Sequence, residues 1–562
     1  MKENLIDTNQ YNIDNIDTSS EENLNMFYFS PIDQIPNRIK EDFKKYQNFL
    51  LIFVNPKSGS KQGLTVLDHV NKYKLNSIKN FNIMSFPVNI SDSSLIKPPQ
   101  ELLDKENGID IINNNNISMK SEIKFDPLIP FSIIVFNIIN KDEMNLGKKF
   151  IKKYLSDFPE FKIKILIAGG DGTVLGIVED LNKENIDLNR CIFGSMPFGT
   201  GNDLSHALGF GSECTVGDIN NFQRVLFTYL IGVESKIDIW ELTLDMNKEN
   251  GAIYDVIKDG EKLKEDKEKN KILTFKKTFV NYFSLGFDAR VGFQFEQRRT
   301  SSRCCNKFVY AIEGAKRIFC CKKNYGLTQL LDGFLEGNNN ININNTNNSS
   351  ENDINILTEK SDSDLEEVPN EPLPLLNEKI TDEDINNINN ISNDKRFVFK
   401  TKKSGQKDII IKGNPVSLIC QNIDFYMGGT RDIWGKTSHL GIEQEEASKE
   451  DYREYKRQVY ENFKKQAFDD KKIEFLTFDN GFEFGLERFA RGLAKRVYQG
   501  PGPVFLEFKK EPDDTERVAL TKVYINCDGE FYHLQNPNEI SVKLNENICN
   551  GQINILRNIK GL

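Results

Sequence analysis

The segment 163–197 constrains the fold of this chain more than any other. Two mainly apolar runs, IKILIAG at 163–169 and CIFGSMP at 191–197, form its two ends. Between them, apolar residues recur at the i, i+3, i+4 and i+7 spacing of one helix face: Val174, Ile177, Val178 and Leu181. A strand, a turn, a helix and a second strand within about 30 residues make a βαβ unit.

Further apolar runs extend this unit into a sheet. FLLIFVNP (49–56) and FSIIVFNII (131–139) have the composition of strands that are buried on both faces, as in a parallel sheet. Later segments, such as VNYFSLGFDARVGFQF (280–295) and KVYINCDGEFYHL (522–534), are rich in aromatic and β-branched residues and are punctuated by glycine. We therefore predict an α/β protein: an N-terminal Rossmann-like parallel sheet, then a β-rich antiparallel sandwich, with a cleft between them.

Polar tracts set the predicted domain boundaries. The tract EGNNNININNTNNSSENDINILTEKSDSDLEEVPNEP is too poor in apolar residues to form a core. We predict a disordered N-terminal region over 1–46, an α/β domain over 47–212, a β-rich domain over 213–545 with a disordered insert at about 337–394, and a C-terminal tail over 546–562.

Glycine-rich loops follow three of the predicted parallel strands: NPKSGSKQG (55–63), GGDGT (169–173) and FGTGND (198–203). Loops at the carboxyl ends of parallel strands line the ligand crevice of an open sheet. Glycine lets backbone N–H groups approach phosphate oxygens, and the following helix N-terminus favours negative charge. The residues predicted to cradle a phosphate-bearing cofactor are Asn55, Pro56, Lys57, Ser58, Gly59, Gly169, Gly170, Gly172, Thr173, Gly199, Thr200, Gly201 and Asn202. Single loops of this kind are equally compatible with tight turns, and Lys57 with a solvated side chain.

Common nucleotide-binding motifs are absent from these loops. None contains the Gly-Lys-Ser/Thr of a Walker A loop, and the glycine spacings in GDGTVLG and GTGNDL do not fit G-x-G-x-x-G. Instead NPKSG, GGDGT and PFGTGNDL, in this order, resemble the diacylglycerol kinase catalytic domain. NYFSLGFDA, FYMGGTRDIWG and INCDGEF resemble the diacylglycerol kinase accessory domain. The resemblance covers most of residues 48 to 540 apart from the inserts.

The resemblance implies transfer of the γ-phosphoryl group of ATP to diacylglycerol, which gives phosphatidic acid. It implies ATP and Mg²⁺ as cofactors. Asp171, Asp203, Asp528 and Glu530 are the implied catalytic residues, and Asp171, Asp203 and Glu530 are the implied metal ligands. In bacterial relatives the residue that matches Asp528 is linked with proton abstraction. In sphingoid-base kinases that role is usually given to the acid of the glycine loop, here Asp171.

Net charge and apolar patterning bear on the partners. The net charge of −10 argues against nucleic acid, because a phosphate backbone needs a basic footprint. No apolar run reaches the roughly 18 residues of a membrane-spanning helix, and the first residues lack the apolar core of a signal peptide. We expect a cytoplasmic protein that visits the membrane peripherally to reach diacylglycerol.

A basic segment is the candidate contact with an anionic membrane surface. The stretch QRRTSSRCCNK contains Arg298, Arg299, Arg303 and Lys307. Each basic residue near an anionic leaflet contributes about 1 kcal/mol. The competing interpretation is a solvated basic helix packed on the second domain.

Two other functions remain open from the sequence. One is the same chemistry on a sphingoid base, ceramide or another lipid alcohol. The other is a lipid-sensing protein without catalysis, against which the presence of Asp171, Asp203, Asp528 and Glu530 argues.

Overall fold

The structure of the protein is a computed structural model. It describes residues 49–58, 62–72, 82–87, 130–199, 201–215, 217–218, 225–226, 228–229, 232–300, 309, 312–316, 325–337, 396–399, 409–428, 430–436, 463–490 and 492–558. The predicted N-terminal region 1–46 and nearly all of the predicted insert lie outside the described residues. So do four predicted site residues: Gly59, Thr200, Arg303 and Lys307.

The first sheet has seven strands in the order β2-β3-β1-β4-β5-β24-β6. Its strands are β1 (Phe49–Val54), β2 (Asn82–Pro87), β3 (Pro130–Asn137), β4 (Ile163–Gly169), β5 (Cys191–Pro197), β6 (Val233–Asp238) and β24 (Gln552–Arg557). The four apolar runs predicted as buried strands are β1, β3, β4 and β5, and they pair in parallel. The predicted centre of the parallel sheet is therefore confirmed.

The sheet is mixed rather than purely parallel, because β2 and β6 pair antiparallel at its two edges. Strand β24 comes from the segment expected as a C-terminal tail and inserts between β5 and β6. Its residues Ile553, Ile555 and Leu556 are buried. Residues 546–562 therefore contain a strand of the first sheet, held there by burial of this short apolar run.

Helices cover both faces of the first sheet. They are α3 (Gln62–Lys72), α5 (Lys141–Asp157), α6 (Asp171–Lys183) and α7 (Asp203–Ala207), with the short 3₁₀ helix η4 (Leu188–Arg190). In β1, Leu51 and Phe53 belong to the apolar core that includes α5 and α6, whereas Leu50 and Ile52 belong to the core on the other face with Val66 of α3. Successive side chains of a strand point to opposite faces, so a strand covered on both faces must be apolar throughout.

The rest of the described chain is mainly antiparallel. One sheet of eight strands comprises β19 (Lys495–Gly500), β18 (Ile473–Phe478), β15 (Ser417–Gln421), β11 (Tyr282–Gly286), β21 (Val523–Cys527), β22 (Glu530–Gln535), β8 (Ala252–Ile257) and β9 (Gly260–Leu263). Another of five strands comprises β10 (Thr274–Phe279), β7 (Trp240–Met246), β23 (Pro537–Leu544), β20 (Val504–Phe508) and β12 (Leu331–Glu336). Side chains from both sheets, among them Trp240, Phe283 and Val542, share one buried core.

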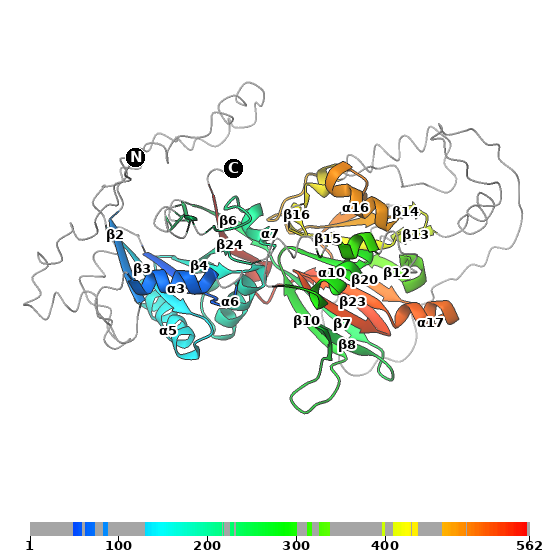
Figure 1. Ribbon diagram of the computed structural model, residues 1–562, viewed down its shortest axis with the longest axis horizontal. Coiled ribbons are helices and arrows are strands. Elements are labelled where there is room, and N and C mark those ends of the chain that lie inside the picture. The colour runs from blue at the N-terminus through cyan, green and yellow to red at the C-terminus, as the bar shows by residue number, and fades with distance from the viewer. Residues whose placement is uncertain are drawn as a thin grey trace, which may run out of the picture.

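Smaller elements flank these sheets. Two hairpins pair β13 (Arg396–Phe399) with β14 (Ile409–Lys412) and β16 (Phe425–Tyr426) with β17 (Thr430–Arg431). The helices are α10 (Phe287–Gln297), α12 (Leu327–Leu330), α14 (Ile433–Lys436), α16 (Gly481–Ala490), α17 (Asp514–Leu520) and the 3₁₀ helix η5 (Cys549–Gly551). Helix α6 contacts β10, and α7 contacts β16. Figure 1 shows α6 and α7 on the side of the first sheet that faces the antiparallel strands.

Candidate active site

The GGDGT loop joins β4 directly to α6. Strand β4 ends at Gly169, Gly170 caps the helix in an extended conformation, and Asp171 is the first helical residue. A Cβ atom on Gly199 would lie 2.6 Å from the Cα of Gly170, so the second and third glycine loops touch through backbone alone. Any side chain at Gly199 would force these loops apart.

The NPKSG loop meets the same edge. The Asn55 N–H donates to the carbonyl of Ala168 at 2.9 Å, and a Cβ on Gly63 would lie 2.1 Å from the Asn55 carbonyl oxygen. The Lys57 side chain is exposed, which leaves both interpretations of this residue open. The three loops therefore converge at the carboxyl ends of β1, β4 and β5, as expected for a phosphate-binding edge.

Three carboxylates meet where the loops face the antiparallel strands. Asp171 and Asp203 begin α6 and α7, and Asp528 lies in the turn between β21 and β22. Residues of the β11 edge join them: the Asn281 side-chain amide donates to Asp171 Oδ2 at 2.8 Å, and the Tyr282 hydroxyl donates to Asp203 Oδ2 at 3.1 Å. The structure therefore brings together three of the four acids predicted from sequence.

Asp171 carries the one oxygen of this group that the structure leaves unsatisfied. Its Oδ2 accepts from Asn281 and from the backbone N–H of Leu204, whereas its Oδ1 is shielded from solvent and has no hydrogen-bond partner. Burial raises the pKa of Asp171 to about 7, and the charges of Asp203 and Asp528 add to the rise. A buried, unpartnered carboxylate oxygen is costly, which indicates a site that needs a positive charge or a proton.

Asp528 is held by backbone donors. Its Oδ1 accepts from the N–H groups of Asn281 (3.0 Å) and Tyr282 (2.9 Å), and its Oδ2 accepts from that of Val280 (2.8 Å). Burial raises the pKa of Asp528 to about 6, although these three bonds act in the opposite direction. Because each carboxylate oxygen can accept two hydrogen bonds, Oδ2 keeps one acceptor position.

The Asp-Gly turn at Asp528 reverses the chain between β21 and β22 and also positions the Asp528 carboxylate. Asp528 has a left-handed φ of 48° and its N–H donates to the carbonyl of Tyr282. The turn that sequence patterns predict for Asp-Gly is present. The same turn also fixes the direction of the carboxylate toward the loops of the first sheet.

Glu530 is engaged by a lysine. Its Oε1 lies 2.9 Å from Lys277 Nζ and its Oε2 accepts from the Tyr532 hydroxyl at 2.7 Å. A Cβ on Gly172 would be 3.6 Å from Glu530 Oε1, so this pair lies over the first turn of α6. Burial acts to lower the pKa of Lys277, but Glu530 outweighs it and the pKa is raised on balance. Lys277 therefore stays cationic beside the loops.

Sequence reasoning missed four participants: Asn281, Tyr282, Lys277 and Gly428. The Gly428 N–H donates to both oxygens of Asp203 at 3.0 Å. Asn281, Tyr282 and Gly428 lie within the NYF and FYMGG segments that carry the resemblance. Their place in these segments was the signal that could have identified them. No sequence periodicity marks a backbone N–H group that contacts an acid distant in sequence.

The acid cluster fits a magnesium ion shared with a substrate. Mg²⁺ usually takes one or two carboxylates and completes its shell with water and phosphate oxygens. Among the described residues, no three His, Cys, Asp or Glu side chains are placed to hold a metal by themselves. The unpartnered Oδ1 of Asp171 suits a shared ion of that kind. The roles of Asp203 and Glu530 as ligands stay predictions, since hydrogen bonds or Lys277 engage their oxygens.

The predicted basic membrane segment is only partly described. Arg298 pairs with Glu313, and Arg299 pairs with Glu296 at 3.1 Å. Glu313 also pairs with Lys316. These pairings reduce the charge that Arg298 and Arg299 offer to a membrane, and both residues follow the end of α10 at Gln297.

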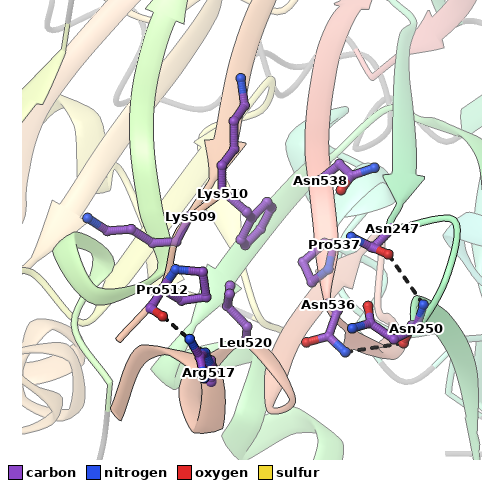
Figure 2. A pocket seen from close by; sticks show the side chains of 11 residues that line it. Asn247, Asn250, Lys509, Lys510, Pro512, Arg517, Leu520, Asn536, Pro537 and Asn538 are labelled. Atoms are coloured by element: carbon purple, nitrogen blue, oxygen red, sulfur yellow. Dashed lines mark hydrogen bonds between the residues drawn. The ribbon is translucent and has the colours of Figure 1, made fainter. Parts of the chain in front are cut away.

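A cavity of about 570 Å³, whose lining side chains Figure 2 shows, has none of the clustered acids in its lining. It is bounded by the ends of β7 and β20, by α17 and by the β22–β23 turn, and its lining includes Lys510, Arg517 and Asn536. Asn536 in the cavity lining and Asp528 in the acid cluster stand at opposite ends of strand β22, and an extended strand rises about 3.3 Å per residue. The cavity contains no predicted site residue.

Comparison with known proteins gives the family. A model described as the diacylglycerol kinase accessory domain matches residues 278–357 and 378–531, and one described as the diacylglycerol kinase catalytic domain matches residues 130–226. The chain belongs to the diacylglycerol kinase family. The catalytic match contains Asp171 and Asp203, and the accessory match contains Asn281, Tyr282 and Asp528, so the acid cluster joins the two family segments.

Curated relatives within the family are similar at modest identity. Diacylglycerol kinase 4 of Arabidopsis thaliana is 25% identical over 312 residues, covering 52% of this chain and 53% of the relative. Diacylglycerol kinase 3 of the same plant is 28% identical over 179 residues, 28% of this chain and 36% of the relative. Human diacylglycerol kinase iota is 32% identical over 155 residues, 26% of this chain and 13% of the relative. The chain matches about a third to a half of the length of these plant relatives.

Neutralising Asp171 is expected to stabilise the protein in the absence of magnesium. The pKa of Asp171 in the folded protein, about 7, lies above the ordinary aspartate value of 3.8. Ionisation therefore opposes folding increasingly as pH rises from about 4 to about 7. In Asp171→Asn the amide oxygen can keep the bonds from Asn281 and Leu204. We expect the midpoint of thermal unfolding to rise at pH 8 by about 2 °C or more, and the gain to shrink toward pH 5. A gain that is equal at both pH values would mean that Asp171 is not a buried acid of raised pKa.

Proposed function

We propose that the chain is an ATP-dependent lipid kinase that phosphorylates the free hydroxyl of 1,2-diacylglycerol and forms phosphatidic acid. The observation that carries this proposal is the meeting of Asp171, Asp203 and Asp528 beside three glycine loops, with one buried oxygen of Asp171 left without a partner. The match to both family segments supports the substrate class.

The glycine loops would hold the nucleotide. Phosphoryl transfer asks a protein mainly for positioning and for neutralisation of charge. The backbone N–H groups at the start of α6 would bind phosphate oxygens, and glycine at 170 and 199 lets the second and third loops pack closely beside them. Lys277 lies beside this helix start and would add positive charge. When bound, Mg²⁺ would neutralise phosphate charge, and Oδ1 of Asp171 would hold it.

Asp528 is the residue that we propose as the general base. Its Oδ2 retains one acceptor position, and its pKa of about 6 suits a group that must be ionised at neutral pH yet accept a proton. Three backbone N–H bonds fix its orientation before substrate arrives. The proton of the attacking hydroxyl would move to this oxygen as the new bond to the γ-phosphorus forms and the bond from that phosphorus to the bridging oxygen of ADP breaks.

The protein would meet its lipid at the membrane surface. Within the described part of the chain, no helix is both long and apolar enough to cross a bilayer. We propose that the protein is cytoplasmic and contacts anionic lipid at the membrane surface peripherally, with Arg303 and Lys307 as the candidate contacts. Arg298 and Arg299 would contribute less, because each is already paired with an acid.

A lipid kinase assay tests the proposal. Purified protein, ATP and magnesium are presented with diacylglycerol, ceramide, sphingosine and monoacylglycerol in the same mixed micelles, and labelled product is separated for each lipid. We expect phosphatidic acid from diacylglycerol and at least tenfold slower reaction with the others, equivalent to about 1.4 kcal/mol in the barrier. Preferred phosphorylation of ceramide or sphingosine would mean that this lipid, rather than diacylglycerol, is the substrate. No product from any lipid would favour a lipid-sensing protein without catalysis.

A further inference from the structure

Asp288 is a buried acid outside the cluster described above. It lies in the first turn of α10 and is fully shielded from solvent. The Ser417 hydroxyl donates to its Oδ1 and the Tyr426 hydroxyl donates to its Oδ2. Burial raises the pKa of Asp288. In some proteins a buried polar group of this kind fixes a specific arrangement of the chain.

The arrangement that Asp288 fixes is the β16–β17 hairpin. Tyr426 is the last residue of β16, and the chain turns directly after it through Met427 (φ 48°) and Gly428 (φ 74°). Left-handed φ at a non-glycine residue costs energy and persists only where neighbours hold it. The bond from Tyr426 to Asp288 holds the start of this turn.

The tip of the hairpin lies on the third glycine loop. A Cβ on Gly428 would lie 3.8 Å from the Cα of Gly201, and the Gly428 N–H donates to both oxygens of Asp203. The Tyr426 and Tyr282 rings are 4.6 Å apart, and the Tyr282 hydroxyl donates to Asp203 as well. Two donors to Asp203 therefore depend on where the Tyr426 ring is held.

We propose that Asp288 is a positioning residue that, through Tyr426, holds the Gly428 N–H and the Tyr282 hydroxyl on Asp203 and so orients this acid for magnesium and ATP. This inference rests on the proposed function. Asp288 itself does not contact Asp203. Its effect passes along the hairpin, from the buried Tyr426 hydroxyl to the backbone N–H two residues later.

Tyr426→Phe is the primary test variant, because it keeps the ring against Tyr282 and removes only the hydroxyl. Tyr498→Phe is the matched control: Tyr498 is buried and its hydroxyl donates to the acid Glu336 at 2.6 Å, in a part of the structure away from the glycine loops. Asp288→Asn is the second variant, which keeps an acceptor for one hydroxyl only. Binding of ATP in the presence of magnesium is measured by calorimetry without lipid, alongside thermal unfolding.

We expect Tyr426→Phe to weaken ATP binding by about 3–10-fold and to raise the magnesium concentration for half-maximal turnover by a similar factor, as for the loss of one hydrogen bond. Tyr498→Phe should lower the unfolding temperature about as much as Tyr426→Phe does, but leave ATP affinity and the magnesium requirement unchanged. Asp288→Asn should change ATP affinity and the magnesium requirement as Tyr426→Phe does. The double variant should show no larger change in either quantity than the single variants.

Unchanged ATP binding and magnesium dependence in a folded Tyr426→Phe or Asp288→Asn protein would overturn the positioning role, whatever the loss of stability. Equal effects of Tyr426→Phe and Tyr498→Phe on binding would also overturn it. The parent protein separates this test from the proposed function: a parent that binds ATP but phosphorylates no lipid contradicts the lipid kinase and leaves the binding comparison valid. A parent that does not bind ATP contradicts both.

Discussion

Asp528→Asn is expected to lower lipid kinase turnover by roughly 10²–10⁴-fold, the usual contribution of a positioned acid–base group. The amide keeps the size of the carboxylate but cannot take a proton at neutral pH. Its oxygen can still accept from Asn281 and Tyr282, whereas its NH₂ group would face the Val280 N–H. We therefore expect a small loss of thermal stability as well, measured by unfolding in parallel with turnover.

Asp259→Asn is the matched control for this change. Asp259 precedes Gly260 in the β8–β9 turn, has a similar left-handed φ of 64°, and is exposed. We expect its turnover to equal that of the parent. Affinity of Asp528→Asn for ATP should change by less than tenfold, or about 1.4 kcal/mol, because the glycine loops proposed to hold the nucleotide lie on the other sheet. Turnover within threefold of the parent in folded Asp528→Asn would remove Asp528 as the base.

Gly170→Asp is expected to abolish turnover with ATP while the protein stays folded. A Cβ at this position would lie 3.3 Å from the Cα of Gly199, so the aspartate side chain would press on the third glycine loop, which is proposed to help hold phosphate. It would also place a second carboxylate beside Asp171, where burial already raises the pKa of one acid. Steric and electrostatic effects thus act in the same direction.

Gly176→Asp provides the comparison for Gly170→Asp. Gly176 is an exposed position of the same helix, and a Cβ there would meet nothing within 4 Å. It should retain most of its turnover, and both variants should unfold cooperatively when followed by circular dichroism. Normal turnover in folded Gly170→Asp would place the GGDGT loop outside the active site.

The sheets could be predicted where the sequence shows a continuous pattern. Apolar runs such as 163–169 mark strands buried on both faces, and the spacing from Val174 to Leu181 marks α6. Strand β24 was missed because Asn554 interrupts its apolar residues and its parallel partner β5 is more than 350 residues away in sequence, a distance over which no local pattern operates.

The acids of the site could be predicted, but not what surrounds them. The glycine loops and the family resemblance identified Asp171, Asp203 and Asp528. The groups that set the behaviour of these acids are backbone N–H donors and the side chains of Asn281 and Tyr282, which lie at the start of β11 in the eight-stranded sheet. Which groups contact Asp171 and Asp203 depends on how two sheets pack together, and a single sequence does not contain that information.

Magnesium titration of Asp171→Asn and Asp528→Asn, with lipid kinase turnover as the readout, tests the assignment of roles most directly. Asp171 is proposed to hold magnesium through its unpartnered Oδ1, so a higher concentration of the ion should partly restore turnover in Asp171→Asn. Asp528 is proposed to accept the proton, so magnesium should not restore turnover in Asp528→Asn. If magnesium restores Asp528→Asn and leaves Asp171→Asn inactive, the two roles are exchanged and the acid of the glycine loop is the base.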